Sequence, residues 1–216
     1  MPKNVYPFKL NNVILPRILS NVSINLLWNF REKEKKIYLT FDDGPNEELT
    51  DWILEILERY HARATFFCLG KNVERFYGQY QKILKYGHSI GNHSYSHLKG
   101  WSTKNKKYFL DIEKAGKLIN SDLFRPPHGR VRLSQINHLK KNYKIVLWDV
   151  LSKDYNPNYR PEKIIRRIIL HARPGSVVVF HDSKQAEKNL KQVLPAILDY
   201  YHNKGYIFSS IPFKQD

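Results

Sequence analysis

The stretch TFDDGP, residues 40–45, places two carboxylates side by side directly after an apolar run. Asp42 and Asp43 are followed by glycine and proline, which are typical of a turn. Taken alone, the stretch fits an ordinary turn rich in Asp and Gly. Near a bound cation, however, two adjacent carboxylates can both stay ionised, because the cation offsets their repulsion. One of them could then hold the ion while its neighbour removes a proton from water.

The stretch HSYSH supplies a second ligand type, because His93 and His97 lie four residues apart. Residues i and i+4 of a helical turn share one face, so both imidazoles could hold one ion. The same spacing alone also fits two surface or capping histidines. Two histidines and one carboxylate, however, leave zinc an open position for water. An aspartate of FDDG is the obvious third ligand.

The chain alternates segments of strand type with segments of helix type. Ile37, Leu39 and Phe41, for example, recur at every second position, which predicts a strand. Strands are predicted at residues 35–41, 64–70, 88–93, 122–127, 143–150, 175–183 and 206–210. Helices are predicted at residues 46–60, 72–86, 103–120, 132–142, 161–171 and 184–203. This alternation, without a low-complexity linker, predicts one α/β domain with a parallel sheet, open or closed into a barrel.

The polar residues of interest lie at or just past the C-terminal ends of the predicted strands. They are Asp42, Asp43, His93, Arg125, Asp149 and His181. In a parallel α/β barrel these strand ends meet on one face, where active sites are built. We therefore expect residues far apart in the sequence to share one pocket.

Five segments together resemble a known family. TFDDGP, HSYSH, RPPHG, WDVLSKDY and VVVFHDS are similar, in order and spacing, to the motifs of the polysaccharide deacetylase family, also called the NodB-homology or carbohydrate esterase 4 family. The resemblance runs from about Ile37 to about Pro212 and implies a distorted (β/α)7 barrel. It also implies a divalent metal, usually zinc, with cobalt or another transition metal as alternatives. The implied reaction removes acetyl groups from N-acetylated or O-acetylated sugars.

The resemblance assigns roles to residues of the first three motifs. Asp42 matches the catalytic base, and Arg125 matches the arginine that orients this base, since a guanidinium can fork onto a carboxylate. Asp43, His93 and His97 match the three metal ligands. The pair of aspartates is thereby divided between holding the ion and activating water.

The resemblance also implies how the leaving group is protonated. His181 matches the catalytic acid, and Asp154 matches the carboxylate that pairs with it. The backbone N–H near His128 matches a donor that stabilises the oxyanion. An amine is a poor leaving group unless it is protonated, so an amide needs this acid more than an ester does.

The predicted substrate-binding residues include three departures from the family pattern. The predicted set is Pro126, Pro127, His128, Trp148, Tyr155 and Val179. Tyr155 stands where the family often has Trp, Val179 where it often has Leu, and His128 where it often has Tyr. Tyr155 and Val179 would line the pocket for the acetyl methyl group, so these departures bear on substrate size and affinity.

The composition favours an anionic partner. Lys and Arg number 36 against 20 for Asp and Glu, which gives a net charge of +16. Such an excess suits nucleic acid, an acidic glycan or a membrane surface. The basic residues are spread along the chain rather than clustered with exposed aromatic residues, which disfavours a nucleic-acid binder. We therefore expect an acetylated carbohydrate substrate, anionic or lipid-linked, and the sequence fixes no oligomeric state.

The domain boundaries are expected near residue 35, with an N-terminal arm at residues 1–35 and the catalytic domain at residues 36–213. Pro16 and Arg17 interrupt the apolar part of the arm, and no small-residue cleavage site follows, so no signal peptide is expected. No window approaches 18 apolar residues, so no transmembrane helix is expected either. These features predict a cytoplasmic protein, with contact between the arm and a membrane surface as the alternative.

Other functions remain open at this level. The same machinery could serve an O-acetyl esterase or a deacylase of a non-glycan amide. A catalytically inactive glycan-binding module on the same barrel would predict a broken site, yet the motif residues are present. An N-acetyl hydrolase is therefore the favoured interpretation.

Overall fold

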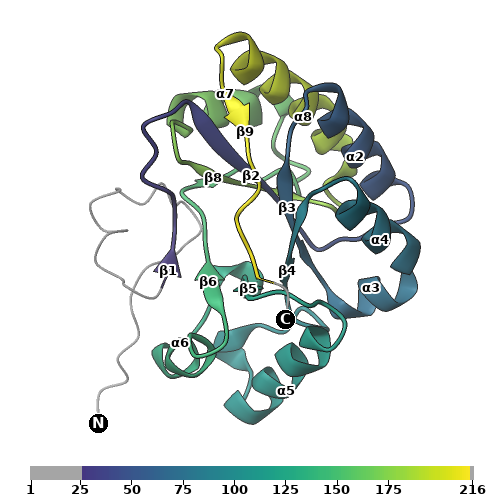
Figure 1. Ribbon diagram of the computed structural model, residues 1–216, viewed down its shortest axis with the longest axis vertical. Coiled ribbons are helices and arrows are strands. Elements are labelled where there is room, and N and C mark those ends of the chain that lie inside the picture. The colour runs from purple at the N-terminus through teal and green to yellow at the C-terminus, as the bar shows by residue number, and fades with distance from the viewer. Residues whose placement is uncertain (1–25, 215–216) are drawn as a thin grey trace.

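The computed structural model describes residues 26–214 of the 216-residue chain. Parallel strands form one curved sheet, and the helices pack along its outer side (Figure 1). In Figure 1 they run from α7 and α8 at the top, past α2, α4 and α3, to α5 and α6 at the bottom. The predicted α/β fold with a distorted barrel is therefore confirmed.

The strands follow a single parallel order. They are β1 (Leu26–Leu27), β2 (Lys36–Asp42), β3 (Ala64–Cys68), β4 (Ser89–Asn92), β5 (Leu123–Phe124), β6 (Lys144–Val146), β7 (Val150–Leu151), β8 (Val177–His181) and β9 (Ile207–Phe208). Their order in the sheet is β1-β6-β5-β4-β3-β2-β8-β7, and β9 also pairs with β2. The central strands are buried on both faces, which explains why segments such as ATFFC and VVVFH are mostly apolar instead of alternating between apolar and polar residues.

The helices cover the sheet with their apolar faces. They are α2 (Leu49–Arg59), α3 (Gly70–Arg75), α4 (Tyr77–Lys85), α5 (Asn105–Gly116), α6 (Leu133–Leu139), α7 (Pro161–His171) and α8 (Glu187–Asn203). The helix predicted at residues 72–86 is divided into α3 and α4, because the chain leaves the helical conformation at Phe76 (φ −123°, ψ 49°). Pro161 begins α7, where its missing N–H and fixed φ suit the first helical position.

One predicted strand, residues 143–150, is two strands in the structure. β6 pairs with β5 and β1, whereas β7 pairs with β8 in another part of the sheet. Asp149 therefore lies beside the start of β8, where its Oδ1 accepts a 2.8 Å hydrogen bond from the backbone N–H of Val177. The prediction that Asp149 lies at a C-terminal strand end is wrong, because the apolar run YKIVLWDV conceals the break between the two strands.

Residues 26–30 bridge the gap that this break leaves in the sheet. β1 pairs with β6, and the N–H of Leu147 donates to the carbonyl of Leu27 at 2.7 Å. The N–H of Phe30 donates to the carbonyl of Gly175, just before β8, at 2.8 Å. The segment thus connects the β6 side of the sheet with the β8 side.

The predicted N-terminal arm lies only partly within the described residues. Its last ten residues, 26–35, include β1 and the bridge to β8. Its remainder, residues 1–25, lies outside them, so the predicted contact of the arm with a membrane stays a prediction. Between residues 26 and 214, no helix is both long and apolar enough to cross a membrane.

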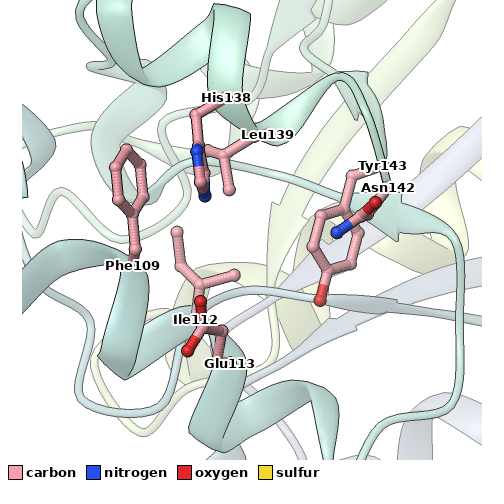
Figure 2. Close-up of a pocket in the computed structure, with 7 residues that line it drawn as sticks. All are labelled: Phe109, Ile112, Glu113, His138, Leu139, Asn142 and Tyr143. Atoms are coloured by element: carbon pink, nitrogen blue, oxygen red, sulfur yellow. The ribbon is translucent and has the colours of Figure 1, made fainter. Parts of the chain in front are cut away.

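A small cavity lies between α5 and α6, away from the strand ends that carry the predicted site. Figure 2 shows Phe109, Ile112 and Glu113 of α5 facing His138 and Leu139 of α6. The rings of Phe109 and His138 are stacked with their centroids 4.0 Å apart. This contact and the buried side chains beside it hold the two helices together.

Gly175 tests the bridge formed by residues 26–30. Gly175 has φ +83°, and a Cβ there would overlap the carbonyl oxygen of Phe30. We expect Gly175→Ala to lower the free energy of unfolding by about 2–4 kcal/mol, through the strained φ and the displaced segment. The control is Gly78→Ala in α4, where no atom lies within 4 Å of the new Cβ; it should be neutral or raise stability by about 0.5 kcal/mol. Urea unfolding of both variants measures the difference, and equal stabilities would contradict the bridge.

Candidate active site

The predicted site residues meet at the C-terminal edge of the sheet. Asp42 is the last residue of β2 and His181 the last of β8, and the two are register partners across these strands. His93 follows β4 directly, and Arg125 follows β5 directly. Parallel strands align their C-terminal ends at one edge, so four segments far apart in the sequence supply one site.

Asp43, His93 and His97 form a cluster suited to a metal ion. Their candidate ligand atoms all lie within 4.8 Å of one another. Asp43 Oδ1 is 3.2 Å from His97 Nε2 and 3.6 Å from His93 Nε2. Asp43 Oδ1 is also buried without a hydrogen-bond partner among the described residues, which is costly for a carboxylate oxygen unless a cation satisfies it. One carboxylate and two imidazoles are a donor set that suits zinc.

Hydrogen bonds and burial prepare the two imidazoles for this role. His93 Nδ1 lies 2.8 Å from the carbonyl oxygen of Arg125, so it carries the proton and leaves the Nε2 lone pair toward Asp43. Burial lowers the pKa of His93 to about 4, although Asp42 and Asp43 act in the opposite direction. Burial, with the nearby His128, also lowers the pKa of His97 to about 4. Both rings are therefore neutral at pH 7, as metal binding requires.

The ligands sit on backbone that local hydrogen bonds hold in an uncommon conformation. Asp43, Ser94 and His97 have φ values of 77°, 67° and 62°, in the left-handed region. The side chain of Asn72 donates to the carbonyl of Asp43 at 2.7 Å, and the N–H of His97 donates to Ser94 Oγ at 3.0 Å. Such strain persists only where surrounding contacts enforce it, which is typical of functional sites.

Arg125 orients Asp42 from inside the barrel. Its Nη1 donates to Asp42 Oδ1 and to Thr40 Oγ1, each at 2.7 Å. Burial raises the pKa of the Asp42 carboxyl, but the positive charge of Arg125, together with that of His181, outweighs burial and holds the pKa below its ordinary value. The second oxygen, Oδ2, is 4.0 Å from His93 Nε2, so this ionised oxygen faces the cluster of candidate ligands.

Asp154 holds His181 in its protonated form. His181 Nδ1 donates to Asp154 Oδ1 at 2.7 Å, and the backbone N–H of His181 donates to Asp154 Oδ2 at 2.9 Å. Burial alone lowers the pKa of His181, but the carboxylate of Asp154, helped by Asp42 and Asp43, raises it to about 9. The imidazole is therefore charged at pH 7 and can donate a proton.

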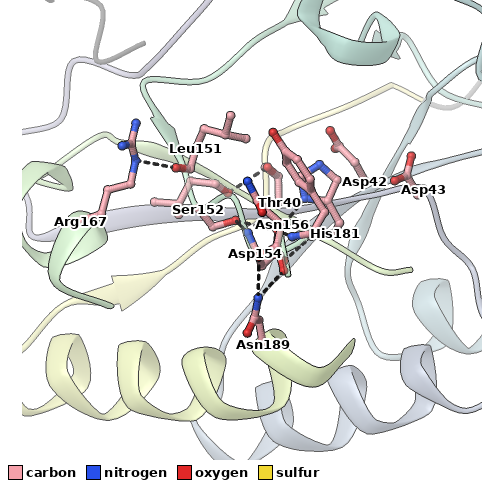
Figure 3. A network of polar contacts seen from close by, with 12 residues as sticks. Thr40, Asp42, Asp43, Leu151, Ser152, Asp154, Asn156, Arg167, His181 and Asn189 are labelled. Carbon is pink, nitrogen blue, oxygen red and sulfur yellow. Dashed lines mark hydrogen bonds and ion pairs between the residues drawn. The ribbon is translucent and has the colours of Figure 1, made fainter. Parts of the chain in front are cut away.

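The loop that carries Asp154 is fixed from both sides (Figure 3). The hydroxyl of Ser152 donates to Asp154 Oδ1 at 2.9 Å. From α8, Asn189 Nδ2 donates to the carbonyl of Asp154 at 2.9 Å, and from α7, Arg167 Nε donates to the carbonyl of Leu151 at 2.9 Å. The carboxylate beside His181 is thereby held in one position.

The predicted substrate-binding residues fall into two groups. Pro126, Pro127, Trp148 and Val179 are buried, the last at 0% exposure within the barrel. His128 and Tyr155, by contrast, border the site. The ring of His128 contacts that of His97 with centroids 4.7 Å apart, and Tyr155 meets His181 at the same separation.

Asp182 and Thr40 belong to the site but were missed by sequence reasoning. Asp182 is fully buried, accepts a 2.5 Å hydrogen bond from the hydroxyl of Thr50 and lies directly behind Gly44. Burial raises its pKa to about 7, although the Thr50 hydroxyl acts in the opposite direction. Thr40 lies in TFDDGP, two residues before Asp42, and Asp182 follows His181 directly in VVVFHDS. Their position beside catalytic candidates was the sequence feature that could have indicated them.

Comparisons with known proteins agree with this geometry. The family model described as polysaccharide deacetylase matches residues 30–144, more than half of the chain. A peptidoglycan-N-acetylglucosamine deacetylase of Bacillus cereus is 33% identical over 85% of this chain and 90% of its own length. A chitooligosaccharide deacetylase of Azorhizobium caulinodans is 31% identical over 70% of this chain and 75% of its own.

The fold agrees as well. The crystal structure of the Bc1960 peptidoglycan N-acetylglucosamine deacetylase superposes with a TM-score of 0.84 at 28% identity, covering 92% of this chain and 95% of that one. These relatives are named as deacetylases of peptidoglycan N-acetylglucosamine and of chitooligosaccharides. The chain belongs to the polysaccharide deacetylase family.

Proposed function

We propose that the protein hydrolyses N-acetyl groups of an acetylated glycan and releases acetate. The observation that carries this proposal is the pairing of two neighbouring groups: Arg125 holds Asp42, Asp154 holds His181, and Asp42 and His181 are register partners at the ends of β2 and β8. A base that takes a proton from water beside an acid that protonates a leaving amine is what amide hydrolysis needs. The relatives named above, which act on N-acetylglucosamine in peptidoglycan and on chitooligosaccharides, support the same class of substrate.

We propose zinc as the resident metal, with cobalt as an alternative. Asp43, His93 and His97 would hold it, because Asp43 Oδ1 accepts no hydrogen bond from residues 26–214 and both imidazoles are neutral. When bound, such an ion acts as a Lewis acid toward a carbonyl oxygen and lowers the pKa of water.

Asp42 acts as the base in this proposal. Arg125 binds Oδ1, so Oδ2 stays available to accept a proton from the attacking water. The neighbouring guanidinium disfavours the protonated carboxyl, which keeps Asp42 ready for the next proton. The backbone N–H of His128 would stabilise the oxyanion that forms on the acetyl group.

His181 acts as the acid from the neighbouring strand β8. Asp154 binds Nδ1 and leaves the Nε2 proton for the leaving nitrogen. Tyr155 and His128 would contact the sugar, since both border the site. Pro126, Pro127, Trp148 and Val179 would shape the pocket from behind, because they are buried.

The two adjacent aspartates separate metal binding from catalysis. Asp43→Ala should lose both bound zinc and acetate release, since two histidines alone hold zinc loosely. Asp42→Asn should keep the ion but lose about 10²- to 10⁴-fold in rate, as expected for a missing general base. Elemental analysis beside acetate release from N-acetylglucosamine oligomers measures both. If only Asp42→Asn lost zinc, Asp42 would be the metal ligand and Asp43 the base. Full activity of the metal-free protein would refute the proposal.

The pH dependence tests the pairing of His181 with Asp154. The acid must be protonated, so kcat/KM should fall as pH rises through about 9. Asp154→Asn removes the negative charge that raises the pKa most, so burial is then opposed only by Asp43 and Asp42 and the pKa falls. The alkaline limb should therefore move to lower pH. Profiles on the amide and on an O-acetyl ester should differ, because the ester depends less on the acid. An unchanged limb in Asp154→Asn would exclude His181 as the acid.

A further inference from the structure

A shelf formed by two loops adjoins the candidate metal cluster. The first loop, residues 97–101, starts at the ligand His97, and the second, residues 128–131, starts at His128, whose ring contacts His97. Trp101 Nε1 donates to the carbonyl of Val131 at 3.1 Å, which joins the far ends of the two loops. The two loops therefore contact each other both at the candidate metal cluster and at their far ends.

Trp101 gives this shelf an exposed aromatic face. Its side chain is 39% exposed, which is unusual for the largest apolar residue type. The indole N–H is already bonded within the chain, and the Arg130 guanidinium carbon lies 5.4 Å from the ring centroid. The ring is thus held in place, and a rigid aromatic ring binds a partner at low entropic cost. An apolar, flat surface of this kind suits the C–H face of a sugar ring.

Positive charge surrounds the same shelf. Lys99 belongs to the first loop, and Arg130 belongs to the second, where its guanidinium lies near the Trp101 ring. Lys99 is exposed to solvent. An anionic group on the shelf would therefore meet one positive charge from each loop.

We propose that Trp101, Lys99 and Arg130 form a subsite for an acidic sugar unit beside the acetylated residue, with its ring on Trp101 and its carboxylate between the two cations. Guanidinium groups recognise carboxylates through paired hydrogen bonds. The protein then favours acidic over neutral N-acetylated glycans. This assignment rests on the proposed glycan deacetylation.

The test uses one glycan in two charge states. The first is a peptide-free tetrasaccharide of alternating N-acetylglucosamine and N-acetylmuramic acid, whose lactyl groups are free carboxylates. The second is the same tetrasaccharide with its lactyl groups converted to methylamides. Size and acetyl groups are equal, so only the charge differs. Calorimetric binding to the zinc-loaded Asp42→Asn variant and kcat/KM of the otherwise unchanged enzyme are measured for both.

The carboxylate form should bind, and react, about tenfold better than the methylamide. Lys99→Gln and Arg130→Gln should each reduce this ratio toward one. Lys85→Gln and Arg59→Gln, exposed changes of equal charge at the helix ends away from the C-terminal strand edge, should leave the ratio intact. Trp101→Leu should raise KM about fivefold for both forms with little change in kcat.

Several outcomes would overturn the subsite. The first is equal binding and kcat/KM for the carboxylate and methylamide forms in the unchanged chain. The second is a preference for the carboxylate form that persists in Lys99→Gln and Arg130→Gln. The third is a loss of this preference in Lys85→Gln and Arg59→Gln as large as in the two subsite variants. Binding to phosphatidylglycerol vesicles that Lys99→Gln abolishes, without any sugar preference, would assign the charges to a membrane surface instead. Preferential binding of the carboxylate without acetate release would retain the subsite while refuting the proposed reaction.

Discussion

The buried guanidinium of Arg125 is the interaction on which the site and the barrel both depend. The side chain is 0% exposed, and an unpaired charge at such a position would be very costly. Besides Asp42 and Thr40, it donates to the carbonyls of Val146 at 3.3 Å and Leu147 at 3.0 Å. These carbonyls lie where β6 ends and the chain crosses toward β7, so the charge that orients the base also satisfies backbone groups at the break in the sheet.

A second buried pair mirrors the first with the charges reversed. Arg125 keeps Asp42 negative, whereas Asp154 keeps His181 positive. Because Asp42 and His181 are register partners at the ends of β2 and β8, the two pairs place a base and an acid side by side. Each pair is shielded from water, which strengthens its influence on the protonation of the group it holds. The local environment thus allows Asp42 to act as a base and His181 to act as an acid at the same pH.

The sequence predicted the site better than it predicted the sheet. Asp43, His93 and His97 stand in short motifs at the ends of strongly patterned strands, so their placement indicated their proximity and the family resemblance indicated their shared role. The position of Asp149 could not be predicted, because YKIVLWDV is apolar on both sides of a break that only tertiary pairing reveals. The partners of Arg125 were equally hidden, since two of them are backbone carbonyls, which carry no sequence signal.

The central claim, that Asp42 is the charged base and His181 the charged acid, can be tested directly by NMR titration of the metal-free protein. Carboxyl carbon shifts report Asp42, and ring nitrogen shifts report His181. The account predicts that, at pH 7, Asp42 is ionised, with a pKa below its ordinary 3.8, and His181 carries protons on both nitrogens, with a pKa of about 9. A protonated Asp42 beside a neutral His181 at this pH would contradict it.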